Sequence, residues 1–205
     1  MTVDAGAAMT AMAMTATVMT AIFALAMVTA MVTDLTSMTI RNRVSIGLTL
    51  GFLLLAPLCG NSLSDFGWHL AVGGIALIIT FALFCLRAMG GGDAKLIAAT
   101  ALWYGPDPSL MDYLVMVSIL GGVLTLTIIL YRMVPRPLLA DRFAFMGTLA
   151  RKDVGIPYGI ALGAAGLWTF PLTPVGESMK AYMAGMFWTL WRTTPTCNFN
   201  LSLCE

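Results

Sequence analysis

Long runs of hydrophobic residues make up most of the chain, and short polar or Gly/Pro-rich breaks separate them. Each run is predicted to be a helix, because a backbone with unpaired amide and carbonyl groups cannot cross lipid. Six spans follow from this pattern, at residues 7–32, 44–59, 68–86, 94–104, 112–131 and 155–171. The pattern therefore predicts an all-α integral membrane protein with six transmembrane helices.

The composition excludes an ordinary soluble domain. Of the 205 residues, 59% are hydrophobic and only 10% are charged, and the mean hydropathy is +0.88, which is typical of a chain embedded in a bilayer. The apolar stretch at 5–32 has no Lys or Arg before it and exceeds the hydrophobic core of a secretory signal, so we expect it to remain as the first helix. We divide the chain into a membrane domain at 1–175 and a tail at 176–205.

The basic residues occur in alternate breaks of the hydrophobic pattern. They are Arg41 and Arg43 after the first span, Arg87 and Lys95 between the third and fourth, and Arg132, Arg136, Arg142, Arg151 and Lys152 after the fifth. Positive charge is concentrated in the cytoplasmic loops of membrane proteins. Nine of the eleven Lys and Arg residues lie in such loops if both termini are outside. We therefore predict that the N-terminus and the C-terminus are outside, which leaves the tail extracytoplasmic.

The fourth span is the shortest. At about 1.5 Å per residue, 94–104 covers only ~16 Å of a hydrocarbon core of ~30 Å, so a re-entrant segment is the alternative. A re-entrant segment would, however, reverse the fifth helix and place the loop with five basic residues outside, against the charge rule. We therefore expect a short crossing helix that its neighbours shield from lipid.

The tail contains a stretch, residues 177–192, that predicts an amphipathic helix at the membrane interface. Its apolar residues recur every four positions, at Met179, Met183, Phe187 and Trp191. Cys197 and Cys204 lie beyond this stretch and are candidates for a disulfide, whereas Cys59 and Cys85 are expected to be unpaired. The cysteine spacing fits no zinc site, and we predict no metal and no cofactor.

Two acids lie at the edges of predicted membrane spans, where ionisable side chains are costly. Asp34 follows the first span, and Asp93 opens the fourth within the sequence Gly-Gly-Gly-Asp-Ala-Lys at 90–95. Under the predicted topology both lie at the cytoplasmic edge of the bilayer, and ionisable groups in such places are functional candidates. In aspartyl proteases two neighbouring carboxylates share one proton and activate a water molecule. The two acids therefore predict a site of this kind, with Asp34 and Asp93 as its catalytic residues.

Each acid also has a simpler interpretation. Asp93 after three glycines is a typical helix N-cap, and Lys95 is then a charge anchor at the membrane edge. Asp34 is then a solvated helix end, although an acid in the last turn opposes the helix dipole by about 0.3 to 1 kcal/mol. In the functional interpretation the glycines leave the backbone open to an extended peptide. The single histidine, His69, is expected to be an interfacial residue at the outer end of the third helix.

These residues resemble the type IV prepilin peptidases, membrane aspartyl proteases of the Gly-x-Gly-Asp class, and in particular the small members that serve tight-adherence (Flp) pili. Residues 90–95 match the family motif Gly-x-Gly-Asp-x-Lys without a gap. Asp34 with Ile40 and Asn42 is similar to the first motif, in which a catalytic Asp precedes Ile-Pro-Asn. Arg41 replaces the proline of that motif, which changes the loop but not the acid.

The resemblance extends over residues 20–170 and includes all six spans. Residues 156–161, with the sequence Ile-Pro-Tyr-Gly-Ile-Ala, are similar to a Pro-Tyr-Gly signature that opens the last helix of the small members. Gly159 and Gly163 form a Gly-x-x-x-Gly face on that helix, and we interpret this face as a site of close helix packing.

The resemblance implies that Asp34 and Asp93 cleave leader peptides from prepilins and pseudopilins at the cytoplasmic face of a bacterial inner membrane. The residues expected to bind substrate or support the site loops are Gly90, Gly91, Gly92, Lys95 and Asn42. The expected partners are the prepilin or pseudopilin precursors and the lipid bilayer, with no nucleic acid. Larger members also methylate the product and carry a cytoplasmic insertion with paired Cys-x-x-Cys, which this chain lacks. We therefore expect residues 1–175 to form a peptidase domain without methyltransferase activity.

Two other functions are compatible with the sequence. A small proton- or cation-coupled transporter would bind or relay its ion at Asp34 and Asp93, although transport favours acids near the midplane and an internal repeat. A non-catalytic assembly subunit would tolerate Asn at either position. Presenilin-type proteases share the Gly-x-Gly-Asp pattern but place Tyr before the first acid, where this chain has Thr33.

Overall fold

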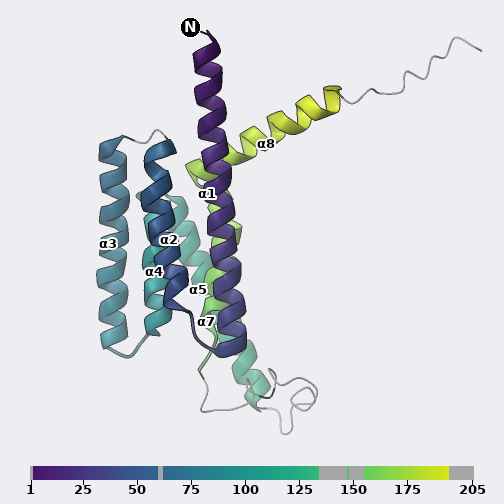
Figure 1. Cartoon of the computed structure of the whole chain (residues 1–205). Coiled ribbons are helices and arrows are strands. Elements are labelled where there is room, and N and C mark those ends of the chain that lie inside the picture. The colour runs from purple at the N-terminus through teal and green to yellow at the C-terminus, as the bar shows by residue number, and fades with distance from the viewer. Residues whose placement is uncertain (1, 60–61, 134–146, 148–154, 194–205) are drawn as a thin grey trace, which may run out of the picture.

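The computed structural model describes residues 2–59, 62–133, 147 and 155–193, and these residues form an all-helical bundle (Figure 1). No strand occurs among them. The α-helices are α1 (Thr2–Ser37), α2 (Asn42–Leu55), α3 (Leu63–Cys85), α4 (Gly91–Tyr104), α5 (Ser109–Met133), α7 (Tyr158–Thr169) and α8 (Pro174–Thr193). Two short 3-10 helices, η1 (Ala56–Cys59) and η2 (Phe170–Leu172), continue α2 and α7.

Every predicted span coincides with one of these helices. Four of them are long and apolar enough to cross a membrane: Ala11–Ser37, Asn42–Cys59, Leu63–Cys85 and Ser109–Met133. Tyr158–Leu172 is a shorter apolar helix. The chain is therefore a membrane protein, and the crossing of α4 and α7 and the sides of the two termini stay predictions.

The short helix α4 forms the centre of the bundle. It packs against α3, α2, α7 and α5, and its residues from Leu96 to Tyr104 are all buried. A helix that is apolar on every face is stable only when protein or lipid covers every face. The expectation that neighbouring helices shield this segment is confirmed.

Aromatic side chains fix the end of α4 that lies away from Asp93. The rings of Phe23 in α1 and Phe170 in η2 stack with their centroids 4.0 Å apart, and the ring of Trp103 in α4 lies against both. The Trp103 indole donates a hydrogen bond of 3.0 Å to the carbonyl of Leu48 in α2, so its polar edge is satisfied within the apolar core. This cluster connects α4 to three other elements.

Small residues bring α1 and α7 into close contact. A Cβ atom at Gly163 would lie 2.8 Å from the carbonyl oxygen of Met27, and one at Gly166 would lie 3.0 Å from the Met27 sulfur. The Met27 carbonyl leaves no room for a larger residue at Gly163, and at Gly166 the Met27 side chain would have to shift. Small-residue faces allow helices to pack closely in membranes in this way. The interpretation of Gly163 as a packing position is confirmed.

His69 is packed against neighbouring helices, whereas the sequence predicted an interfacial residue. Its Nδ1 atom lies 2.8 Å from the carbonyl oxygen of Leu102, and its ring stacks on Phe52 with centroids 5.1 Å apart. The ring also covers Gly105, where the backbone has φ of +63° and a Cβ would collide with it. The half-buried His69 therefore holds the end of α4 against α3.

The two connections α1–α2 and α3–α4 lie at one end of the bundle, and the start of α1 and the whole of α8 lie towards the other (Figure 1). The predicted tail helix is present as α8, which contacts α1 and η2 and exposes Met183 and Phe187. Cys59 and Cys85 are free thiols. Other predicted features lie outside the described residues: Arg136, Arg142, Arg151, Lys152, Cys197, Cys204 and the Trp191 side chain.

Candidate active site

Asp34 is a buried carboxylate held by the start of another helix. It lies in the last turn of α1 and is only 5% exposed. The backbone N–H of Gly159, in the first turn of α7, donates a hydrogen bond of 2.6 Å to Asp34 Oδ2. The first amides of a helix have no partner within the helix and carry partial positive charge. The start of α7 therefore compensates the placement of Asp34 at the unfavourable end of α1, and the solvated-end interpretation is wrong.

The close approach of Asp34 also requires glycine, with no side chain, at position 159. A Cβ atom at this position would lie 2.8 Å from Asp34 Cβ and Oδ2 and 2.9 Å from Asp34 Cγ. No ordinary Cβ contact is that short, so any side chain would displace the acid or the helix. The sequence pattern predicts only a packing role for Gly159, although the Pro-Tyr-Gly signature marks this position.

Asp93 occupies the first turn of α4, ahead of the apolar stretch 94–104. The N-cap of α4 is Gly90, and no side chain makes a capping hydrogen bond there. The interpretation of Asp93 as an N-cap is therefore wrong. Its carboxylate lies so near the chain that a Cβ at Gly90 would be 2.8 Å from Asp93 Oδ2. Glycine at position 90 leaves room for the acid.

The next two glycines are packed against the protein and are less open than expected. A Cβ at Gly91 would meet the ring of Phe84 at 3.1 Å, and one at Gly92 would meet Ile40 Cβ at 3.1 Å. These contacts seat the first turn of α4 against α3 and against the α1–α2 connection. The glycines therefore support the position of Asp93 in addition to lining the space around it.

Asp34 and Asp93 line the same cavity. This cavity has a volume of about 1050 Å³ and is lined by the ends of α1 and α3, the first turn of α4, the middle of α5 and the start of α7. The three glycines before Asp93 also line it. Both acids therefore lie at the same end of the bundle, and the side of the membrane to which this end belongs stays a prediction.

The two acids interact electrostatically. Burial, and then the nearby Asp34 carboxylate, raise the pKa of Asp93 above its ordinary value. Both effects disfavour the ionised form, because water is replaced by protein and a second negative charge lies close by. Asp93 therefore keeps its proton to a higher pH than a solvated aspartate does.

Two residues with left-handed backbone conformation line the same cavity. Met38 ends α1 with φ of 51°, and Arg87 follows α3 with φ of 60°. Glycine normally takes such positions after a helix, and other residues pay roughly 1–2 kcal/mol for them. Arg87 lines the cavity of the acids, and no feature of the sequence predicts this.

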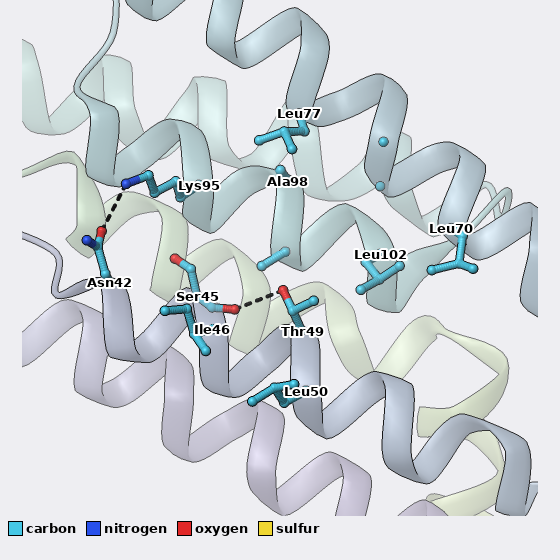
Figure 2. A pocket seen from close by; sticks show the side chains of 13 residues that line it. Asn42, Ser45, Ile46, Thr49, Leu50, Leu70, Leu77, Lys95, Ala98 and Leu102 are labelled. Atoms are coloured by element: carbon cyan, nitrogen blue, oxygen red, sulfur yellow. Dashed lines mark hydrogen bonds between the residues drawn. The ribbon is translucent and has the colours of Figure 1, made fainter.

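Lys95 and Asn42 do not line the cavity of the acids. Lys95 Nζ donates a hydrogen bond of 3.1 Å to Asn42 Oδ1, which joins α4 to the start of α2 (Figure 2). Both residues line a second cavity between α2, α3 and α4. In the described part of the chain, no three His, Cys, Asp or Glu side chains come together as a metal site would require.

The α7 side of the cavity is fixed by Tyr158. Its hydroxyl lies 2.8 Å from Thr125 Oγ1 of α5, and its ring packs over Gly121, where a Cβ would meet it at 3.0 Å. These contacts fix Tyr158, which directly precedes Gly159 in the chain. The wall that holds Asp34 is thereby connected to α5.

Residues 21–130 match the model of the type IV leader peptidase family. The chain belongs to this family. The matched region contains both Asp34 and Asp93 but ends before α7, so it does not include Gly159. Neither the search of curated proteins nor the search of solved structures found a match. Family membership supports a membrane-embedded peptidase of the leader peptidase kind.

The coupling between the acids predicts the pH dependence of Asp93 labelling by a hydrophobic carbodiimide, which reacts with protonated carboxyl groups. We expect labelling of Asp93 to persist above the pH at which a solvated aspartate ceases to react, and to fall as pH rises through its raised pKa. In Asp34→Asn one negative charge is removed, so the midpoint should move to lower pH. Peptide mass spectrometry measures the labelled fraction. An unchanged midpoint in Asp34→Asn would show that the acids are not coupled.

Proposed function

We propose that the chain is an aspartyl endopeptidase that removes leader peptides from prepilins or pseudopilins, with Asp34 and Asp93 as its catalytic pair. The observation that carries this proposal is the shared cavity: two acids from helices far apart in sequence line one space of about 1050 Å³. Membership of the leader peptidase family supplies the substrate class. The proposed substrates are those of the small tight-adherence (Flp) members.

In the proposed mechanism Asp93 carries the proton that the pair shares, because burial, and then the Asp34 charge, raise its pKa. The Asp34 carboxylate takes a proton from a water molecule as the water oxygen attacks the scissile carbonyl carbon. Asp93 donates its proton to the carbonyl oxygen, which forms a neutral tetrahedral intermediate. As this intermediate collapses, one of its hydroxyl groups returns a proton to Asp93, the C–N bond breaks, and the proton held by Asp34 passes to the leaving amine.

The hydrogen bond from Gly159 fits this mechanism. It engages Oδ2 of Asp34 at 2.6 Å and leaves Oδ1 for the water. A base must be within hydrogen-bond reach of the proton it removes, and a fixed carboxylate holds that geometry without reorganisation. Gly159 is thus proposed as a positioning residue that acts through Asp34.

The place of the site also suits the substrate. Both acids lie at one end of the bundle, where α1 ends and α4 begins, and this is the level at which a leader peptide meets a hydrophobic helix that enters the bilayer. The charge rule assigns this end to the cytoplasmic face. We therefore propose cleavage on the cytoplasmic side of a bacterial inner membrane.

Substitution of either acid tests the pair. Asp34→Asn and Asp93→Asn should each abolish processing of a co-expressed prepilin, since neither amide can exchange the proton that the mechanism requires. The matched control is Asp112→Asn, because Asp112 is an exposed acid in the first turn of α5, outside the lining of the cavity. Immunoblots of membranes measure cleavage and protein level together. Continued processing by either acid variant at normal protein level would refute the catalytic pair.

Gly159→Ala tests the positioning role. The added methyl group would displace the Asp34 carboxylate, and misplacement by about 1 Å can cost roughly 100-fold in rate. We expect kcat to fall by about that factor while KM changes little. Gly67→Ala is the control, because a Cβ at Gly67 has nothing within 4 Å. Equal kinetics for the two variants, at equal thermal stability, would exclude a role for Gly159 in catalysis.

The absence of a Cys-x-x-Cys insertion leads us to propose that the enzyme does not methylate its product. The new N-terminus of pilin processed by this chain should carry a free α-amino group when S-adenosylmethionine is supplied. Intact-mass and N-terminal peptide analysis of the product measures this. A methylated N-terminus that depends on this chain would contradict the proposal.

A further inference from the structure

A second cavity lies on the opposite side of α4 from the acids. It is a groove of about 520 Å³ whose floor is α4 and whose walls are α2 and α3 (Figure 2). Ile46 and Leu50 on α2 and Leu70 and Leu77 on α3 line it, and each of these side chains is 42–56% exposed. Both walls belong to helices long and apolar enough to cross a membrane. The groove is therefore open to the hydrocarbon of the bilayer.

The groove has the dimensions of a single lipid acyl chain. An α-helix is about 10–12 Å across with its side chains and rises ~5.4 Å per turn, so roughly one turn would fill the whole volume. Along α4 the lining residues run from Lys95 to Leu102, which is about 10 Å of helix. One leaflet contributes about 15 Å of hydrocarbon. The groove thus follows most of one leaflet, as a lipid acyl chain does.

One end of the groove is positively charged. Lys95 and Asn42 lie there, and the lysine ammonium donates to the neutral amide oxygen of Asn42. Within the described ranges no carboxylate lies within ion-pair distance of Lys95. An ammonium group has three donors, so charge and donors remain for an anion. Arg41 and Arg43, which flank Asn42 in sequence, are also exposed.

We propose that this groove binds an anionic phospholipid of the surrounding bilayer, with one acyl chain along α4 and the phosphate at Lys95. The apolar walls match the acyl chain, and the unneutralised ammonium at one end matches the headgroup. This binding site is separate from the cavity of the acids, and it does not depend on the proposed peptidase activity.

Lipid retention by the purified full-length chain tests the proposal. The protein is equilibrated with equal amounts of phosphatidylglycerol and phosphatidylcholine of identical acyl chains, and native mass spectrometry measures which lipid stays bound. We expect phosphatidylglycerol to be retained about fivefold over phosphatidylcholine, the effect of one basic residue near the headgroups. Equal retention of the two lipids by the wild-type chain would overturn the role of charge.

Two variants separate the headgroup contact from the acyl chain contact. Lys95→Gln should reduce the fivefold preference to about onefold while lipid is still retained. Gly74→Leu should abolish retention of both lipids, because Gly74 lines the groove and a Cβ there has nothing within 4 Å, so a larger side chain is expected to extend into the groove.

The controls are matched to each change. Gly47→Leu adds the same side chain on α2 at a position that is also open but does not line the groove, and Lys180→Gln removes one exposed positive charge on α8. Both should behave as the wild type does. Normal retention by Gly74→Leu, or a preserved preference in Lys95→Gln, would overturn the proposal. Normal lipid retention by Gly74→Leu together with lost prepilin processing would assign the groove to the substrate instead.

Discussion

The hydrogen bond from the Gly159 amide to Asp34 is the interaction on which the site depends. A buried carboxylate without a partner would be costly in a membrane protein, and the end of α1 offers it only unfavourable carbonyl dipoles. The first turn of α7 supplies the missing donor at 2.6 Å. Because Gly163 and Gly166 let the same two helices approach closely further along, packing and polar satisfaction favour the same arrangement of α1 and α7.

The buried helix α4 divides the protein into two chemically different sides. Asp93 and Lys95 are two residues apart, and residues with this spacing on a helix do not face each other. Asp93 therefore lines the cavity of the acids, whereas Lys95 lines the apolar groove between α2 and α3. The Gly-x-Gly-Asp-x-Lys sequence consequently serves two places in the fold, and helix geometry alone separates them.

The sequence was sufficient for features that depend on local pattern. The apolar runs predicted each helix, and the glycines before Asp93 marked the start of α4, because periodicity and turn residues act over short distances. The partner of Asp34 could not be deduced in this way, since Gly159 lies 125 residues further along the chain and a backbone amide leaves no chemical signature in a sequence. The same limit applies to Lys95, which follows Asp93 by two residues in sequence but lines the groove between α2 and α3.

The electrostatic coupling of the two acids affects their protonation before a substrate binds. Burial, and then the Asp34 charge, raise the pKa of Asp93, so the carboxyl groups already influence each other without a substrate. Charges separated by more than about 10 Å would be largely screened if solvent lay between them, and burial of Asp34 reduces that screening. The Asp34 charge therefore already favours the protonated form of Asp93 before a substrate binds. What a substrate must still supply is exclusion of bulk water from a cavity of about 1050 Å³, which would strengthen the same interaction.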